Sequence, residues 1–341
     1  MSMMKERREI MNEVNRTLFI PLYGKARVSR MNIIIRDPTA EAIWEREAFP
    51  IHGKSRSKWL AYNMAMRARV FDDWTDRMLA QNPRALVLHV GCGLDSRCRR
   101  VTQPYDSWID CDFSEVIAVR RKYYEETEHY RMAALDASDP AQVASLPDCG
   151  AAIVVLEGLS MYLTNEQLRA FLQVLHDKYQ SLHILMDIYT EFGARASKVK
   201  NPVNDVGVTE LYGVDDIEGL LAGTGIRLQA EHSFTPAYLV DMLKPAERAF
   251  FKLMFTGKMY SRIYRLPELA KTKIALEKGL PVEMGARLTG ETEEEIRKDA
   301  EALSALFKKQ KTHAPLKESD PGNGDNKDAA MRELLNGLKN Q

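Results

Sequence analysis

The apolar run at residues 85–90 constrains the fold of this chain most, because a turn containing two glycines follows it directly. Gly91 and Gly93 end the run, and Asp110 and Asp112 come at the end of the next apolar run. Glycines after a buried strand let the backbone turn sharply and approach a bulky ligand, and an acid after the next strand can accept both hydroxyls of a ribose. This pattern predicts a nucleoside-bearing cofactor across the first two strands of a sheet, with a purely structural turn as the alternative.

From about residue 80 to 235, short apolar runs alternate with segments of helical periodicity. Such alternation is typical of parallel strands joined by crossover helices. We therefore expect an α/β fold with a doubly wound, mostly parallel sheet. The predicted strands are residues 85–90, 107–111, 131–135, 151–156, 182–188 and 226–232.

Several residues mark where helices begin and end. Thr164 and Gln167 have the spacing of a capping box at the start of the helix after the fourth strand. Ser114 is expected to cap the helix after the second strand. Gly223 and Gly225 are expected to end another helix just before the last of these strands.

The glycine spacing also bears on which cofactor is bound. A dinucleotide fingerprint requires a third glycine where this chain has Ser96, and Asp95 stands where a pyrophosphate would meet a carboxylate. A negative charge there repels phosphate but suits a cationic sulfonium and a free ammonium. The chemistry favours S-adenosyl-L-methionine over NAD, and a nicotinamide-dependent oxidoreductase is the competing hypothesis.

We expect three parts along the chain: an N-terminal helical cap at 1–80, a cofactor-binding core at 81–266 and a helical C-terminal extension at 267–341. The cap can close over the carboxyl edge of the sheet, where open α/β folds bind their ligands. Within these parts we expect helices at 58–79, 291–311 and 328–338, and a disordered linker at 312–327.

Composition excludes several classes of partner. Lys plus Arg and Asp plus Glu both number 48 among 341 residues, so nothing in the net charge indicates nucleic acid or an anionic membrane. No apolar run approaches the roughly 18 residues of a membrane helix, and the N-terminus lacks the apolar segment of a secretory signal. Four cysteines without metal-binding spacing indicate free thiols, no metal site and a cytoplasmic location. Association into a homo-oligomer is left open.

Several passages together resemble one family, the leucine carboxyl methyltransferase-like proteins, and in particular their bacterial polyketide O-methyltransferase branch of the tetracenomycin type. The resemblance covers roughly residues 15–265 and implies a Rossmann-like class I methyltransferase fold with S-adenosyl-L-methionine as cofactor. One departure is Ser96, where the family usually has threonine. The passages that carry the resemblance are residues 17–26, 35–40, 67–73, 90–97 with Asp110 and Asp112, and 157–163.

The resemblance implies roles in cofactor binding. Lys25, Arg67 and Arg69 match the cations that hold the methionine carboxylate, and Glu157 is expected to meet the methionine ammonium. Asp110, or else Asp112, takes the ribose, and Asp136 is placed near the adenine amino group. Each of these residues has another interpretation when the resemblance is set aside. Arg67 and Arg69 can lie on a solvent-facing side of a helix. Glu157 can be a surface acid at a strand end, and Asp136 can cap a turn at Ser138.

The methyl acceptor is expected to be a small secondary metabolite carrying a carboxylate or a hydroxyl; a protein carboxyl group and a non-catalytic descendant are the alternatives. Tyr162 matches a family position that faces the substrate, and packing beneath the next helix is its other interpretation. A carboxylate acceptor needs no base, whereas a hydroxyl does. His89 is predicted to be a packed core residue, Asp187 to position an acceptor or cap a loop, and His52 and His232 are weaker candidates for a base. A loop at 190–212, with Lys198, Lys200 and Tyr212, is expected to line the acceptor pocket.

Overall fold

A computed structural model describes residues 18–47, 49, 51, 53–200, 210–271 and 298–305, without the side chains of residues 54, 198–200, 258 and 259. The chain divides into two compact units, Met1–Lys273 and Ile274–Gln341. The described part of the second unit is a helix over residues 298–305, inside the charged helix predicted at 291–311. The predicted linker at 312–327 and the helix at 328–338 lie outside the described residues.

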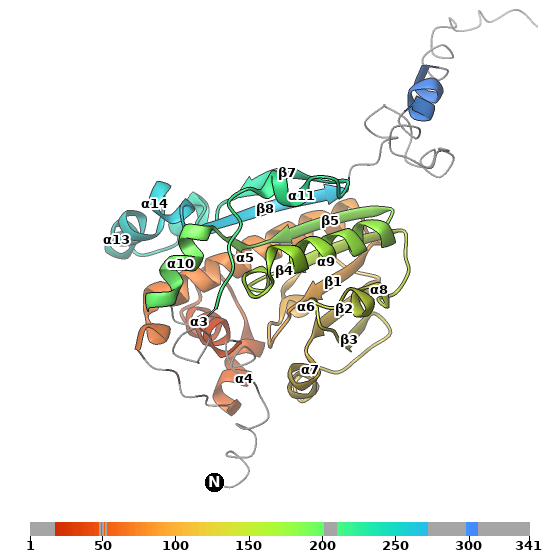
Figure 1. Ribbon diagram of the computed structural model, residues 1–341. Coiled ribbons are helices and arrows are strands. Elements are labelled where there is room, and N and C mark those ends of the chain that lie inside the picture. Colours follow the sequence, from red (N-terminus) through yellow and green to blue (C-terminus); the bar gives the residue numbers. More distant parts are fainter. Residues whose placement is uncertain are drawn as a thin grey trace, which may run out of the picture. The chain divides into compact units, whose positions relative to one another are not determined.

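The first five strands of the first unit form a parallel sheet in the order β3-β2-β1-β4-β5 (Figure 1), which confirms the predicted doubly wound arrangement. The strand order reverses between β1 and β4, and open α/β sheets bind their ligands at such a point. The five strands are β1 Leu86–Val90, β2 Ser107–Asp112, β3 Tyr130–Ala134, β4 Ala151–Leu156 and β5 Ser181–Met186, close to the predicted bounds.

One strand of the sheet was missed by sequence reasoning. β8 (Tyr264–Lys271) runs antiparallel to β5 and continues past the predicted end of the core at 266. Its other edge pairs with β7 (Ile226–His232), with a register shift between Leu228 and Ala230, and its first residues pair with β6 (Ile188–Tyr189). The predicted strand at 182–188 is therefore two strands, β5 and β6, which Asp187 separates.

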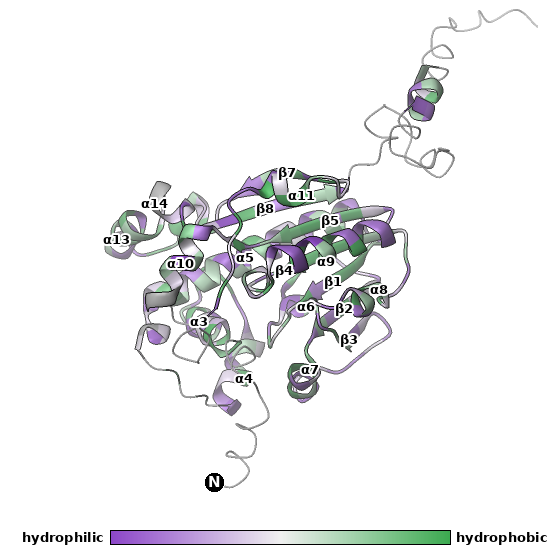
Figure 2. Cartoon of the chain, viewed as in Figure 1, coloured by the Kyte–Doolittle hydropathy of each residue, from purple (hydrophilic) through white to green (hydrophobic). Residues whose placement is uncertain are grey.

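Helices cover both faces of the sheet. Along β1, Val87 packs in the same buried cluster as α5 (Lys58–Gln81), whereas Leu86 and Leu88 pack in the cluster that includes α9 (Asn165–Lys178). This follows from the pleat, because successive strand residues point to opposite faces. β4 is hydrophobic along its length and α9 is amphipathic (Figure 2), as expected for a buried strand covered by a surface helix. The further helices over the sheet are α6 Arg97–Arg100, α7 Ser114–Arg120, α8 Pro140–Ala144 and α11 Ile217–Leu221.

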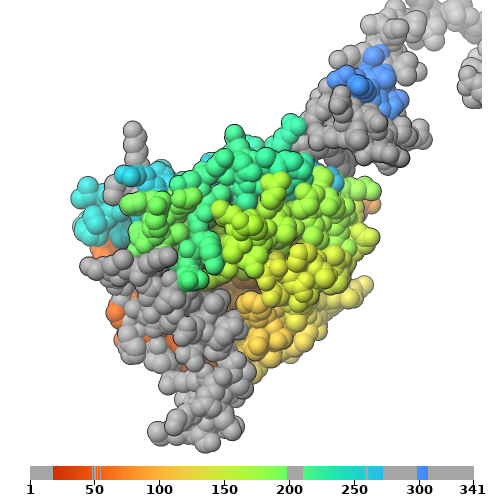
Figure 3. All heavy atoms as spheres, in the orientation of Figure 1, coloured from red at the N-terminus to blue at the C-terminus, as the bar shows by residue number. Residues whose placement is uncertain are grey.

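The N-terminal segment is helical, as predicted, and α5 covers the helix expected at 58–79. Residues of α3 and α4 belong to the same buried cluster as α5, so this segment packs as part of the first unit. None of the described helices is both long and apolar enough to cross a membrane. Figure 3 shows the face that α9, α11 and β7 build. The remaining helices are α3 Phe19–Arg30, α4 Pro38–Glu47, η1 Gly53–Arg56, α10 Glu191–Lys200, α12 Ala237–Val240, α13 Pro245–Phe255 and α14 Lys258–Ser261.

Two of the three predicted helix-boundary signals are confirmed. The capping box of Thr164 and Gln167 is formed, and Gly223 and Gly225 have positive φ angles of 75° and 70° just after α11. The predicted cap at Ser114 is wrong by one residue: Phe113, with extended backbone, is the N-cap, and Ser114 is already helical.

The segment predicted as a loop at 190–212 begins instead with the helix α10, so its expected loop structure is wrong for this part. The side chains of Lys198 and Lys200 and residues 201–209 lie outside the description, and Tyr212 is partly exposed.

Candidate cofactor and acceptor site

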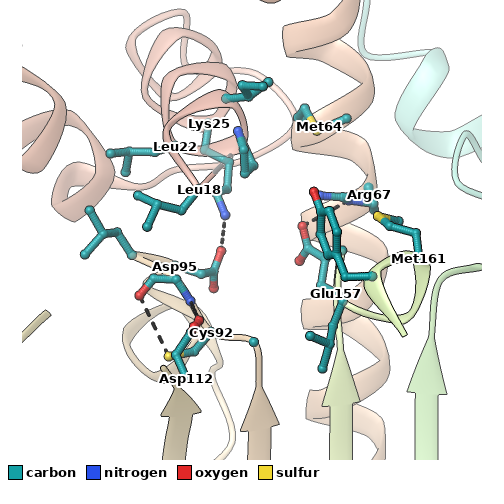
Figure 4. A pocket seen from close by; sticks show the side chains of 18 of the residues that line it. Leu18, Leu22, Lys25, Met64, Arg67, Cys92, Asp95, Asp112, Glu157 and Met161 are labelled. Atoms are coloured by element: carbon teal, nitrogen blue, oxygen red, sulfur yellow. Dashed lines mark hydrogen bonds and ion pairs between the residues drawn. The ribbon is translucent and has the colours of Figure 1, made fainter. Parts of the chain in front are cut away.

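A pocket lies at the carboxyl ends of β1, β2 and β4, where the strand order reverses. Its volume is about 1230 Å³, counting the part that is open to solvent. Side chains from α3 and α5 line it opposite the strand ends (Figure 4), in line with the expectation that the N-terminal helices cover this edge. The residues below are therefore brought together by parts of the chain that are far apart in sequence.

The glycine turn after β1 forms one wall of the pocket. Gly91 and Gly93 have φ angles of 71° and 52°, a region that side chains rarely adopt. A Cβ atom at Gly91 would also lie 3.1 Å from the Cβ atom of Leu159, so the turn has no room for a larger residue there. The amide of Gly93 donates to Oδ2 of Asp112 at 2.7 Å. The turn thus brings bare backbone and a carboxylate to the same side of the pocket.

The two acids of β2 have different surroundings. Asp112 ends the strand and lines the pocket, and its Oδ1 accepts from the amide of Phe113 at 2.8 Å. Burial raises the pKa of Asp112 to about 6 despite these amide donors. Asp110 lies two residues deeper on the same strand face and is fully buried. Of the two predicted ribose acids, the structure places Asp112 in the pocket and Asp110 in the core.

Asp110 belongs to a buried polar cluster beneath the pocket. Its carboxylate pairs with Arg120 and accepts from the hydroxyl of Tyr130 at 2.6 Å and the indole of Trp108 at 2.9 Å. Burial alone would raise the pKa of Asp110, but Arg120 and the hydrogen bonds outweigh it and lower the pKa to about 2. Asp110 is therefore a structural acid that supports the strand below the glycine turn.

Asp95 is already neutralised by cations of the protein. Its carboxylate pairs with Lys25 from α3 and with Arg100 at 3.1 Å, and it accepts from the amide of Arg97 at 2.8 Å. These cations hold the pKa of Asp95 well below its usual range although burial opposes them. From the sequence, Asp95 was expected to present a negative charge that repels phosphate and suits a cationic sulfonium and an ammonium. In the structure that charge is shared with Lys25 and Arg100, so Asp95 fixes Lys25 at the pocket wall.

Glu157, which follows β4, is the third acid that lines the pocket and is held from two sides. Oε1 accepts from Nε of Arg67 at 3.1 Å, and Oε2 accepts from Nη2 of Arg97. Arg67 also donates through Nη1 to Oδ2 of Asp187 at 2.9 Å, and the amide of Gly158 donates to Oδ1 of Asp187 at 2.6 Å. Burial would raise the pKa of Glu157, but Arg67 and Arg97 lower it to about 2. The pocket therefore presents an ionised carboxylate in a fixed orientation.

Two predicted cofactor residues do not reach the pocket. Arg69 pairs with Asp73 one helical turn along α5, at 2.7 Å, and its side chain is 40% exposed. Asp136 accepts from the amide and the hydroxyl of Ser138, at 2.8 and 2.7 Å, which is the turn-capping role that the sequence left as its alternative. Neither residue lines the pocket.

Of the three histidines considered from the sequence, only His89 borders the pocket among the described residues. His89 is buried in the core, as predicted, between Asp110 and Arg97, although one edge of it borders the pocket. His232 pairs with Glu268 on β8 and does not line the pocket, and His52 lies outside the described residues. Among the described residues, no group of three or more His, Cys, Asp or Glu is arranged to hold a metal ion.

Beyond Glu157 the pocket becomes aromatic. Tyr162, in the short helix η2 (Ser160–Tyr162), lines this half together with Met161. The hydroxyls of Tyr189 and Tyr264 lie 3.3 Å apart, and their ring centroids are 4.7 Å apart. Phe234 and Tyr260 complete the wall, with ring centroids 5.7 and 5.2 Å from that of Tyr264. The site thus has a charged half beside the glycine turn and an aromatic half beside η2.

Two features of the charged half were not predicted from the sequence. One is the contact of Arg97 with Glu157, and the other is the ion pair between Asp187 and Arg67. Arg97 stands directly after the Asp95-Ser96 pair of the glycine motif, so the motif itself contained the signal. Its partners Asp72 and Glu157 are 25 and 60 residues away, however, and no local pattern identifies pairs at that separation.

Comparison with known proteins identifies sequences that are similar to this chain. The family model for leucine carboxyl methyltransferase matches residues 17–176. The tetracenomycin polyketide synthesis O-methyltransferase TcmP of Streptomyces glaucescens is 29% identical over 241 residues, which cover 69% of this chain and 88% of TcmP. The chain is thus similar to the leucine carboxyl methyltransferases over residues 17–176 and to TcmP over most of its length. These similarities identify it as a methyltransferase, so the competing hypothesis of a nicotinamide-dependent oxidoreductase is wrong.

Two further proteins resemble this methyltransferase. The S-adenosyl-L-methionine-dependent methyltransferase dpfgK of Gibberella zeae is 28% identical over 181 residues, 48% of this chain and 61% of that protein. Among solved structures, magnesium protoporphyrin IX methyltransferase from Synechocystis PCC 6803 with bound SAH matches with a TM-score of 0.43 at 13% identity. That match covers 69% of this chain and 94% of the other.

Proposed function

We propose that this chain transfers a methyl group from S-adenosyl-L-methionine to a carboxylate or hydroxyl oxygen of a small, polyketide-like secondary metabolite. The observation that carries the proposal is the pocket with two unlike halves, one charged and one aromatic, at the point where the strand order reverses. The relatives TcmP and dpfgK support the same type of reaction. S-adenosyl-L-methionine is the cofactor.

The charged half fits the polar groups of that cofactor. Asp112, held by two backbone amides, has lone pairs left to accept from ribose hydroxyls. Glu157 is the acid for the methionine ammonium, because an ionised carboxylate is the partner that a buried cation needs. Lys25 and Arg67 are the cations for the methionine carboxylate, and both line the pocket. The positive φ angles of Gly91 and Gly93 let the backbone turn sharply at the wall of the pocket, where a bulky ligand can approach it.

The side chains of the aromatic half have two tasks in the reaction. The bound cofactor supplies a methyl group on a cationic sulfonium and needs no further activation. The protein must therefore orient the acceptor oxygen and exclude water, and the packed rings of Tyr189, Phe234, Tyr260 and Tyr264 serve both purposes. Tyr162 offers a hydroxyl that can donate to the acceptor oxygen.

The described residues of the aromatic half include no imidazole. A carboxylate acceptor, with a pKa of about 4, is ionised at neutral pH and needs no base. A hydroxyl acceptor needs a base within hydrogen-bonding reach. A carboxylate is therefore the acceptor that this site can methylate without a general base.

Methyl transfer tests the proposal directly. The full-length protein is incubated with S-adenosyl-L-methionine and a matched pair of aromatic acceptors that share one skeleton, one with a carboxylate and one with a phenol. Mass spectrometry should detect a product heavier by one methylene unit, together with S-adenosylhomocysteine. A panel of such pairs that yields neither product, with a protein that binds the cofactor, would contradict a small aromatic acceptor.

A further inference from the structure

Arg97 lies beneath the charged half of the pocket and does not line it. The side chain is fully buried, and its guanidinium lies 5.2 Å from the centroid of the Phe71 ring. It donates through Nε to Oδ1 of Asp72 at 2.9 Å, through Nη1 to Nε2 of His89 at 3.1 Å, and through Nη2 to Oε2 of Glu157. These three acceptors lie on α5, on β1 and directly after β4, so one side chain joins three elements.

We infer that Arg97 is a positioning residue that orients the carboxylate of Glu157 toward the ammonium of the methyl donor. The inference rests on the proposed function, because it assigns Glu157 to that ammonium. Arg97 does not line the pocket, whereas Glu157 and the glycine turn do, so we assign Arg97 to Glu157 and not to the donor itself.

The geometry explains why an arginine is needed. A guanidinium presents five N–H donors in a rigid plane, and here three separate nitrogen atoms each serve a different acceptor. A lysine ammonium at the same place is a single point that cannot reach acceptors on three elements. The bond to Glu157 therefore has a fixed direction only while Asp72 and His89 anchor the rest of the guanidinium.

The hydrogen bond to His89 helps to fix the orientation of the Arg97 guanidinium. A guanidinium can only donate, so Nε2 of His89 accepts from Arg97 and the ring proton is on Nδ1, which faces Oδ1 of Asp110 at 3.2 Å. Burial, aided by Arg97, lowers the pKa of His89, so the ring is neutral. The chain of hydrogen bonds thus runs from Asp110 through His89 and Arg97 to Glu157.

A comparison of two ligands separates positioning from a merely structural role. S-adenosylhomocysteine carries the ammonium, and its deamino analogue carries the same adenosyl and carboxylate groups without it. Calorimetric titration of the Arg97→Lys variant should show an affinity about tenfold lower for S-adenosylhomocysteine, the loss expected for one misdirected charged hydrogen bond. Affinity for the deamino analogue should stay within about twofold of wild type, because that ligand makes no use of Glu157.

Arg120→Lys is the matched control. Arg120 is equally buried and pairs with Asp110, but it donates to the carbonyl oxygen of Gly93 rather than to Glu157. Its substitution should weaken both ligands by the same factor. A Glu157→Gln background should also remove most of the effect of Arg97→Lys, because the two changes act on one interaction.

Equal losses for both ligands in Arg97→Lys, or no loss for either, would overturn the inference. If Arg97→Lys does not fold, Asp72→Asn replaces it: this variant keeps Arg97 but weakens the anchor at Nε. Asp72 also pairs with Arg100, so both ligands should lose affinity, and the loss should be larger for S-adenosylhomocysteine. Equal losses for the two ligands in Asp72→Asn would then overturn the inference. Failure of the proposed function looks different, because the wild-type protein would then bind neither ligand.

Discussion

Asp112 should make cofactor affinity depend on pH in a direction that the structure specifies. The carboxylate lines the pocket, and burial raises its pKa from 3.8 to about 6. Only the ionised form can accept from both ribose hydroxyls while the amides of Gly93 and Phe113 also donate to it. Between pH 7 and pH 5 the ionised fraction falls from about nine tenths to about one tenth, so affinity for S-adenosylhomocysteine should fall about tenfold.

Calorimetric titrations at several values between pH 5 and pH 7 measure this effect. The amino and carboxyl groups of the ligand titrate outside this range, so they contribute little to the slope. The Asp112→Asn variant is the control: it should bind more weakly at pH 7 and show an almost flat profile. A flat profile in the wild-type protein, or the same slope in the variant, would refute the assignment of Asp112 to the ribose.

The same pKa shift has an opposite consequence for stability. Between pH 3.8 and about 6 the folded state holds a proton on Asp112 that the unfolded state has released, so this group makes unfolding easier as pH rises. A shift of this size corresponds to at most about 3 kcal/mol. Urea unfolding should therefore show the free energy of unfolding of Asp112→Asn rising relative to wild type between pH 4 and pH 7. A constant difference would mean that the pKa is not raised.

Three substitutions test other parts of the site. Arg67→Ala should weaken S-adenosylhomocysteine binding about tenfold or more, because it removes a pocket cation and a partner of Glu157. Arg69→Ala is its control and should change the affinity less than about twofold in the same titration. Tyr162→Phe should lower kcat in a methyl-transfer assay and leave S-adenosylhomocysteine affinity unchanged; a change in affinity alone would place Tyr162 on the cofactor side. Gly91→Ala should lower the free energy of unfolding by about 1–2 kcal/mol or more in urea titrations, since its φ angle of 71° disfavours a side chain and Leu159 occupies the space.

The central sheet could be predicted because its signal is local. Buried parallel strands read as continuous apolar runs, and all five parallel strands lie close to the predicted ranges. β8 gives no such signal: its sequence includes Pro267, which cannot donate to a strand ladder, and charged residues interrupt its apolar positions. Its place depends on antiparallel pairing with β5 and β7, which lie far away in the sequence.

In the candidate site too, the features with a local sequence signal could be predicted, and the contacts between distant elements could not. The glycine turn, Asp112 and Glu157 follow strand ends, so the sheet topology alone brings them to one edge. The choice between Asp110 and Asp112 depends on depth beneath that edge, which the spacing of two residues does not reveal. The ion pairs that join Lys25 to Asp95 and Arg97 to Glu157 connect different elements, and only the packed structure shows that these charges neutralise one another.

Equilibrium titration of the full-length protein with S-adenosylhomocysteine, with NAD in a parallel experiment, tests the central claim most directly. A pocket that matches an adenosyl group joined to an amino acid should bind one S-adenosylhomocysteine per chain and give no heat with NAD. Absence of S-adenosylhomocysteine binding, or displacement of bound S-adenosylhomocysteine by NAD, would contradict the account.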